Sequence, residues 1–339
     1  MEEKSSKQEK PYESIFDAFR VIAPSSPLLQ LETETPQFFM RTCKYDVINM
    51  GGYYSAFPGF PTRLFRGEYK NYPTCKASIY RSNDPDDFIV DELRCLEFKN
   101  ILMTFPQVQY AIQDRMKVDF LALAQHYELN TRMIDMTSEP EIAAYFATHQ
   151  WDNGVAVPVE SGIGCIRGFN APFLFAQNPK FHMIGLQCFQ RPGIQAAYGI
   201  EMEPDEDLNH RGWRVFFKQN AEASRLIHLN FHLDEERMNH AVNSRAETEA
   251  DVLSTAGWLF PQEEIADVAK MVKTCKTISR ATVEEYGRPC EAALAGKGIH
   301  IVDFPVYTLT DIHRKELEEL YKGRPYGDVQ LTARMVVRK

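Results

Sequence analysis

A small set of side chains in this 339-residue sequence has the types and spacing that chemistry on a small molecule requires. Arg66 stands directly before Gly67, and its planar guanidinium with five N–H donors fits a phosphate better than an ammonium does. His126 can accept from a hydroxyl or donate to a phosphate, and Asp135 offers a carboxylate. The structural alternative is that Arg66 pairs internally with Asp135 or Glu68 and that His126 bonds to backbone.

The local sequence predicts the elements that must position these residues. Residues 62–66 have the pattern of a strand that delivers Arg66, and residues 118–126 that of a helix ending at His126. Asn130 is expected to take the left-handed conformation of a helix stop, before a short strand over residues 131–136. Residues 138–141 have the form of a capping box, which predicts a helix through about residue 149.

The rest of the chain mixes helices and strands without regular alternation, which favours an α+β fold over a doubly wound sheet. We interpret residues 1–60 as an N-terminal lead-in, 61–280 as the core domain and 281–339 as a C-terminal strand–helix extension. Further helices are expected at 14–22, 87–100, 235–242, 246–257, 263–275 and 311–322, and further strands at 164–166, 213–217, 227–232 and 299–304.

Composition excludes several function classes. The net charge of −9 and a pI near 5.6 argue against duplex nucleic acid or an anionic membrane as the main partner, because both are bound through clustered Lys and Arg. The polar amino end lacks the apolar core of a secretory signal, and no later apolar run is long enough to cross a bilayer. These features predict a cytoplasmic protein.

Metal and hydrolase sites are not indicated. The seven cysteines are widely spread without a C-x-x-C pair, which favours reduced thiols over disulfides or a zinc site. His228 and His232 would lie about 13 Å apart on a strand, too far to chelate one ion, and we expect them to face solvent. G-x-G-x-x-G, the P-loop pattern and G-x-S-x-G are all missing from the sequence.

Three segments, in order, carry a family resemblance. They are Leu64-Phe65-Arg66-Gly67 followed by Tyr80-Arg81; the run from Leu121 to Thr137 with its Q-H-Y and T-R-x-x-D-x-T elements, continued by A-x-x-F-A at 143–147; and Arg191-Pro192-Gly193-Ile194-Gln195 leading to Gly199. Leu259-Phe260-Pro261 adds a C-terminal tripeptide. The chain resembles the FRG domain family, found largely in bacterial proteins, over about residues 62–275.

A remoter resemblance links this order of motifs to ADP-ribosyltransferases, which break the nicotinamide–ribose bond of NAD and pass ADP-ribose to an acceptor. It implies a split, antiparallel-type sheet with flanking helices, and NAD in a cleft that all three segments line. The implied partners are a nucleotide-like small molecule and a protein acceptor.

The same resemblance implies roles for individual residues. Arg66 would contact phosphate, His126 and Thr131 would surround the ribose, and Asp135 and Gln195 would orient it. Gln195 is an amide and cannot act as a base. The implied nucleotide-binding set is Arg66, Gly67, Gln125, His126, Tyr127, Thr131, Arg132 and Thr137.

Several of these residues could instead have purely structural roles. Glu201 begins an E-x-E sequence and is a candidate carboxylate, but residues 201–207 also read as a solvated acidic loop. Asp135 could salt-bridge Arg132 or cap the following turn. Tyr127 could be a core aromatic, and the hydroxyls of Thr131 and Thr137 could merely satisfy loop amides.

Function hypotheses from different classes follow. The first is an NAD-using ADP-ribosyltransferase-like protein, whose family setting suggests a bacterial toxin or antiphage effector. The alternative is a non-catalytic sensor or regulatory module that binds a nucleotide derivative, supported by Gln195 in place of a glutamate. An interaction scaffold is the third.

Overall fold

A computed structural model describes residues 10–32, 46–50, 53–57, 60–228 and 262–318. Within these ranges it omits residues 114, 116, 153–154, 178–179, 186, 190–191, 193–194, 313 and 316–317.

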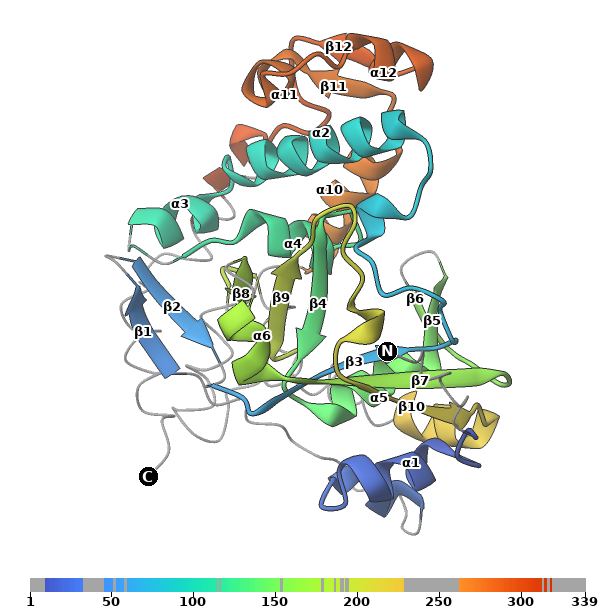
Figure 1. Ribbon diagram of the computed structural model, residues 1–339. Coiled ribbons are helices and arrows are strands. Elements are labelled where there is room, and N and C mark those ends of the chain that lie inside the picture. Colours follow the sequence, from blue (N-terminus) through green and yellow to red (C-terminus); the bar gives the residue numbers. More distant parts are fainter. Residues whose placement is uncertain are drawn as a thin grey trace.

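A six-stranded sheet forms the centre of the described structure (Figure 1). Every neighbouring pair in it is antiparallel, which confirms the prediction of an α+β fold with an antiparallel sheet. The strands predicted around the motifs are confirmed within a few residues. In spatial order the strands are β10 (Trp213–Lys218), β7 (Ile163–Asn170), β3 (Arg63–Glu68), β4 (Met133–Thr137), β9 (Ala197–Glu201) and β8 (Phe181–Met183).

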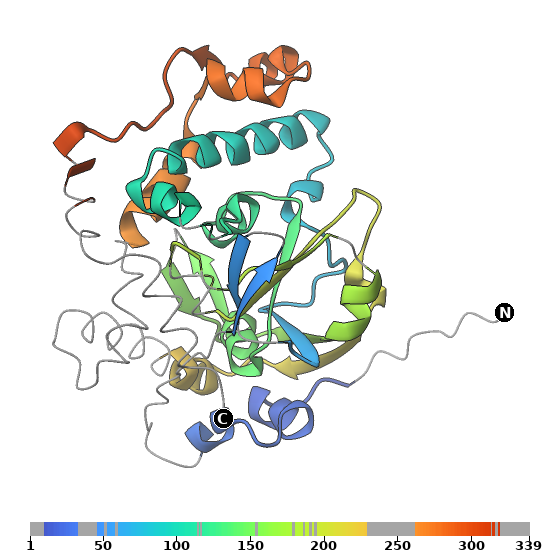
Figure 2. The same cartoon turned by 90° about the vertical axis from the view of Figure 1, so that its left-hand side faces the viewer.

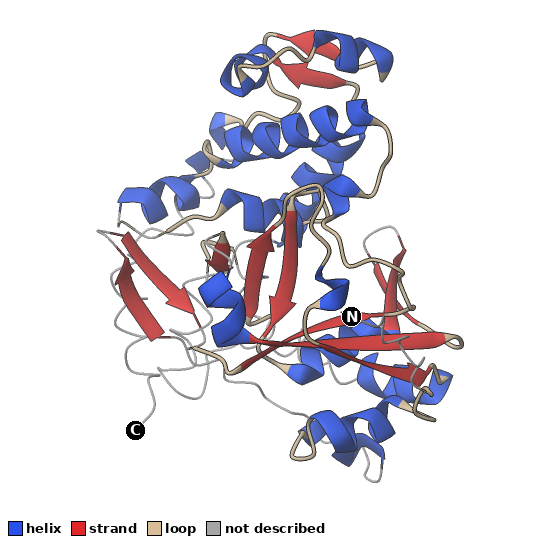
Figure 3. Cartoon of the chain, in the orientation of Figure 1, coloured by secondary structure: helices blue, strands red, loops and turns tan. Residues whose placement is uncertain are grey.

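The sheet is divided between β3 and β4. These two strands share a single registered pair, Phe65 opposite Thr137, whereas β3 pairs with β7 along its whole length and β4 does the same with β9. Beyond the junction the strands diverge, and Figure 3 shows β4 and β9 running steeply across the direction of β3 and β7. Two three-stranded halves therefore meet at one point.

Opposite faces of β3 enter different hydrophobic clusters, because successive side chains of a strand point to opposite sides. Phe65 packs with α1 (Ile15–Ile22) and α5 (Pro140–Thr148). Leu64 packs with the Leu174 side chain of α6 (Ala171–Gln177) and with Tyr198 of β9. The segment is thus covered on both faces.

A layer of helices lies beyond the ends of β4 and β9 (Figures 1 and 2). It contains α2 (Pro85–Leu102), α3 (Pro106–Gln113), α4 (Phe120–His126) and α10 (Gln262–Thr274). A buried cluster that includes Phe98, Leu123, Tyr127 and Val268 joins them. This cluster holds the carboxyl end of α4, and with it His126, against the sheet.

The far side of α2 carries a small C-terminal unit. Its strands β11 (Thr277–Ser279) and β12 (His300–Val302) pair in parallel, and its helices are α11 (Arg280–Tyr286) and α12 (Glu291–Gly296). Leu93 of α2 packs there with Ile278 and Leu294. The domain boundaries remain predictions.

Short elements complete the described chain. They are the hairpins β1 (Asp46–Met50) with β2 (Tyr53–Phe57) and β5 (His149–Asp152) with β6 (Val155–Pro158), and the 3-10 helices η1 (Pro27–Glu32), η2 (Ser78–Tyr80) and η3 (Leu208–His210). No helix in the described ranges has the length and apolar character to span a membrane.

Several local predictions are wrong. The N-cap of α5 is Glu139 and no side chain caps it, so residues 138–141 form no capping box; the Glu141 carboxylate instead accepts from Ser26, 2.6 Å away. The left-handed residue after α4 is Glu128, at φ 67°, rather than Asn130. Residues 221–228 are helical, which contradicts the start of the strand predicted at 227–232.

Other predictions fall partly or wholly outside the described residues. Wholly outside are the helices expected at 235–242 and 246–257, the tripeptide Leu259-Phe260-Pro261, and His232. His228 is half-buried, with Nδ1 3.2 Å from Nε2 of His149, so it does not simply face solvent as expected.

Gly67 allows α5 to cross β3 closely. An alanine Cβ at this position would lie 1.8 Å from the Ala143 carbonyl oxygen and 2.7 Å from the Ala147 amide nitrogen. Both neighbours are backbone atoms, so β3 and α5 would have to separate. We expect Gly67→Ala to lower the free energy of unfolding by about 3 kcal/mol, measured by urea denaturation.

Gly296→Ala is the matched control. Its Cβ would meet only the Asp86 carboxylate at 3.3 Å, the end of a flexible side chain, so we expect a change below about 1 kcal/mol. Equal stability of the two variants would contradict the close packing of β3 on α5.

Candidate functional site

A cavity of about 300 Å³ lies where β3 and β4 diverge. It brings together the end of β3, the end of α4 with the following turn, β4, α5 and Gln195, two residues before β9. The lining residues are Phe65, Arg66, Gly67, Ser78, Gln125, His126, Glu128, Leu129, Asn130, Asp135, Met136, Thr137, Ile142, Ala143, Phe146, Trp151 and Gln195. All three motif segments thus contribute, although Arg191, Gly193 and Ile194 lie outside the described residues.

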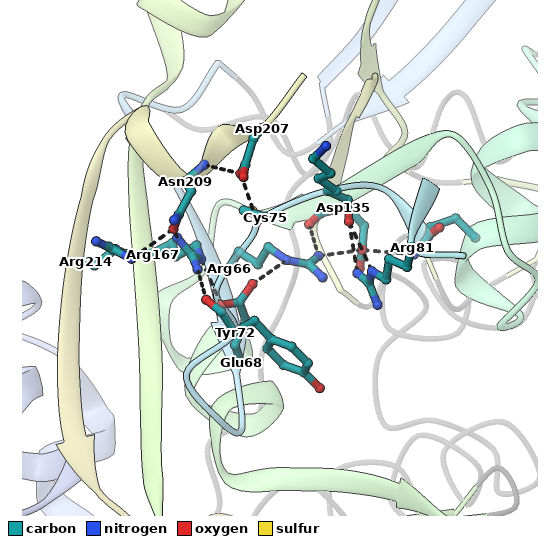
Figure 4. A network of polar contacts seen from close by, with 12 residues as sticks. Arg66, Glu68, Tyr72, Cys75, Arg81, Asp135, Arg167, Asp207, Asn209 and Arg214 are labelled. Carbon is teal, nitrogen blue, oxygen red and sulfur yellow. Dashed lines mark hydrogen bonds and ion pairs between the residues drawn. The ribbon is translucent and has the colours of Figure 1, made fainter. Parts of the chain in front are cut away.

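Arg66 lines the cavity and is held by two carboxylates (Figure 4). Its Nη1 donates to the Asp135 carbonyl oxygen at 2.8 Å and to Asp135 Oδ1 at 2.9 Å, and its Nε lies 3.5 Å from Glu68 Oε1. Burial lowers the pKa of Arg66, but the neighbouring carboxylates outweigh it and leave the pKa above its usual value. The internal ion pair, one of the two alternatives for Arg66, is therefore present.

Glu68 contacts a second arginine, Arg167, as well as Arg66. Its Oε2 accepts from Nε of Arg167 at 2.8 Å, and Arg167, which is 1% exposed, also donates to Asn209 Oδ1 at 2.7 Å. Figure 4 shows Arg66 between Glu68 and Asp135. Glu68 is therefore shared by two arginines, through a hydrogen bond from Arg167 and an ion pair with Arg66.

Asp135 presents an ionised carboxylate to the cavity. Burial raises its pKa, but the charges of Arg66 and His126 and the hydrogen bond from Arg66 bring it below its ordinary value. A further donor reaches Oδ1 from Gln125 Nε2 at 3.2 Å. Arg132, offered as a possible partner of Asp135, instead pairs with Glu92 of α2.

The two threonines of the second segment satisfy local groups. Thr131 is fully buried and donates to Gln125 Oε1 at 2.6 Å. Thr137 donates to the carbonyl oxygen of Gln195 at 2.7 Å and accepts from the Glu139 amide at 3.1 Å. Thr137 lines the cavity and Thr131 does not, so the predicted ribose contact of Thr131 is not supported by its position.

Three other predicted site residues also lie away from the cavity lining. Tyr127 is a core residue that packs against Phe98, with ring centroids 6.4 Å apart. Arg132 points to α2, as its pair with Glu92 shows. Glu201 bonds His182 Nε2 at 2.9 Å. Helix and sheet packing, which local spacing does not reveal, separates these residues from the cavity.

Part of the chain that lines the cavity matches a known protein family. Residues 62–154 match the family model of the FRG domain. This chain contains an FRG domain. The matched range includes Arg66, Asp135 and the α5 helix. Neither the curated proteins nor the solved structures contain a match to the chain.

Aromatic side chains that the sequence analysis did not assign to the site form one wall of the FRG cavity. Phe146 and Trp151 stack, with ring centroids 5.2 Å apart and planes 15° apart, and Ile142 lies beside them in the lining. Phe146 belongs to the A-x-x-F-A element, to which the sequence analysis assigns no ligand contact. Trp151 follows on β5, and only the turn from α5 into this hairpin brings it to the cavity.

The FRG site therefore combines an anchored carboxylate, amides and an aromatic wall. Asn130 and Gln195 supply polar groups, and His126 is 5% exposed at the cavity edge of α4. Among the described residues, no cluster of His, Cys, Asp and Glu could hold a metal ion. Such a lining suits an uncharged or cationic ring that carries hydrogen-bond donors.

Beside the site, His182 of β8 ties α4 to β9. Its Nδ1 lies 2.5 Å from Asp119 Oδ2 at the start of α4, and its Nε2 bonds Glu201. Burial lowers the pKa of His182, but hydrogen bonds to the two carboxylates outweigh it and raise the pKa to about 9. The ring is thus a half-buried cation between two anions at neutral pH.

This pair of bonds predicts a pH-dependent contribution to stability. A folded-state pKa above the unfolded value near 6.5 stabilises the fold fully below about pH 6.5, and the effect is lost as pH rises through 9. We expect His182→Gln to cost about 2–3 kcal/mol at pH 6 and markedly less at pH 10, measured by urea denaturation. His210→Gln, at an exposed position, should change little, and equal losses for H182Q at both pH values would refute the charged bridge.

Proposed function

We propose that the FRG cavity binds NAD by its nicotinamide–ribose end and that the protein is ADP-ribosyltransferase-like. One observation carries this proposal: the anchored carboxylate of Asp135, the Phe146–Trp151 stack and Gln195 line the same cavity. A carboxylate beside an aromatic wall is what a cationic ring attached to a sugar requires.

The charges around the cavity favour binding of the nicotinamide ring of NAD over binding of its phosphates. Arg66, the cation predicted to bind phosphate, is paired with Asp135 and lies near Glu68, and Glu128 adds a further acidic side chain to the lining. The oxidised nicotinamide ring carries a positive charge, which these carboxylates attract. We therefore assign Arg66 the role of anchoring Asp135.

The size of the cavity agrees with this orientation. A volume of about 300 Å³ is at the lower end of the range for ligand pockets, roughly 300–1,000 Å³. It accommodates a ring and a sugar, so the pyrophosphate and adenosine would extend outside.

The chemistry follows from the position of Asp135. As the bond between nicotinamide and ribose lengthens, positive charge develops on the sugar, and an ionised carboxylate stabilises it. The low pKa of Asp135 keeps it ionised at neutral pH, while the Gln195 amide can hold a ribose hydroxyl. Because Glu201 lies away from the cavity, Asp135 takes the role of the site carboxylate.

A non-catalytic sensor of NAD-like molecules is the second candidate. Gln195 cannot act as a base, and Glu201 is engaged by His182, which favours binding without turnover. A toxin or antiphage role for either form rests on family analogy alone.

Incubation with NAD labelled in the nicotinamide ring separates the two candidates. Release of labelled nicotinamide, with transfer of ADP-ribose to an added protein acceptor, supports the transferase. Saturable binding without release supports the sensor. If the folded protein neither binds nor cleaves NAD, both candidates fail.

The charge argument predicts a preference between oxidation states. We expect NAD⁺ to bind at least about tenfold more tightly than NADH, whose nicotinamide ring is uncharged, a difference of about 1.4 kcal/mol. Titration calorimetry or quenching of tryptophan fluorescence measures both affinities. Equal affinities would contradict the assignment of the ring to this cavity.

Asp135→Asn tests the carboxylate directly. The substitution removes the charge of the carboxylate but keeps the size and shape of the side chain. We therefore expect NAD⁺ affinity to fall about tenfold and the preference for NAD⁺ over NADH to disappear. Asp303→Asn is the matched control, because Asp303 is an exposed partner of Arg280 outside the lining. Unchanged NAD⁺ affinity in folded D135N would refute the role of Asp135.

A further inference from the structure

The Thr131 hydroxyl determines which way the Gln125 amide faces. Its oxygen accepts from the Met133 amide at 3.1 Å, and its single hydrogen points to Gln125 Oε1 at 2.6 Å, with the Met133 carbonyl farther away at 3.4 Å. The Gln125 Nε2 group then faces Asp135 Oδ1 at 3.2 Å. A flipped amide would place two acceptor oxygens, Gln125 Oε1 and Asp135 Oδ1, against each other, which is unfavourable.

Both side-chain donors reach the same oxygen of Asp135. Arg66 Nη1 and Gln125 Nε2 donate to Oδ1, and no further side chain among the described residues donates to this carboxylate. The Asp135 side chain is 25% exposed and lines the cavity.

We propose that Thr131 and Gln125 set the ligand specificity of the FRG cavity. They direct the second protein donor to Asp135 Oδ1 and so leave Oδ2 as an acceptor for a hydroxyl or N–H of the ligand. Thr131 acts as a positioning residue, because it is buried outside the lining and acts through Gln125. This inference rests on the proposed function in that the cavity binds a small molecule.

A specific ligand class follows. A site that offers an open carboxylate oxygen selects molecules with a hydrogen-bond donor at that point and rejects analogues that present an oxygen acceptor or a carboxylate there. NAD carries two such donor groups near its glycosidic bond, the ribose hydroxyls and the carboxamide NH₂.

The amide orientation can be tested without any ligand. The titration of Asp135, followed by carboxyl ¹³C NMR on the full chain, reports the donors at Oδ1, while Arg66 and His126 supply the other charges that act on it. We expect Thr131→Val to raise the Asp135 pKa by about one unit, because Gln125 Oε1 loses the donor that holds the amide against Asp135. Thr131→Ser keeps the hydroxyl and should restore the wild-type titration within a few tenths of a unit.

Thr131→Val leaves the Met133 amide without its acceptor and can therefore fail to fold. A second variant avoids this problem. Gln125→Met keeps Thr131 and its bond to the Met133 amide but removes the donor to Asp135, together with the acceptor of the Thr131 hydroxyl, so it should raise the Asp135 pKa in the same way. If both folded variants titrate like the wild type, or if T131S behaves like T131V, the inference is overturned.

Ligand specificity is tested with NAD, nicotinic acid adenine dinucleotide, in which a carboxylate replaces the carboxamide, and the 2′-deoxyribosyl analogue of NAD. We expect at least one analogue to bind the wild type tenfold or more weakly than NAD, and Gln125→Met to reduce that ratio below threefold. Equal binding of all three by the wild type would overturn the inference. If NAD itself does not bind, the proposed function fails, whereas the Asp135 titration still decides the role of Thr131 and Gln125.

Discussion

The ion pair between Arg66 and Asp135 joins the two halves of the central sheet. The ladder between β3 and β4 consists of one registered pair, so immediately beyond Phe65 the strands are connected by a side chain that bonds both the carbonyl and the carboxylate of Asp135. Glu68, held by the buried Arg167, forms an ion pair with the same guanidinium. The cavity exists because the strands part here, and it keeps its shape because this pair spans the gap.

The same interaction decides the chemistry of the cavity. An arginine paired with carboxylates is a weak phosphate ligand, whereas the carboxylate it anchors remains ionised and lines the cavity. The aromatic wall of Phe146 and Trp151 lies in the same lining. Charge and shape together therefore favour a cationic ring bearing hydrogen-bond donors over an anion.

Much of the local structure could be predicted from the sequence, because it depends on neighbours along the chain. The hydrophobic periodicity of residues 87–100 and 118–126 corresponds to α2 and α4, and the strand patterns at 62–66 and 213–217 correspond to β3 and β10. The three motif segments predicted that Arg66, His126, Asp135 and Gln195 line one pocket, and all four do. Predictions failed where packing overrode local signals, as at the residue 138–141 capping box.

Sequence alone determined the family motifs, the element types around them and the residues able to do chemistry, since these follow from side-chain type and short-range spacing. Tertiary structure alone decided which partner each residue has. Arg132 pairs with Glu92 and Tyr127 packs against Phe98. Trp151 lines the cavity from the β5–β6 hairpin. Gly67 is required by a helix backbone that crosses its strand. Such contacts join residues from separate elements, and the directions of those elements are set by the packing of the whole core.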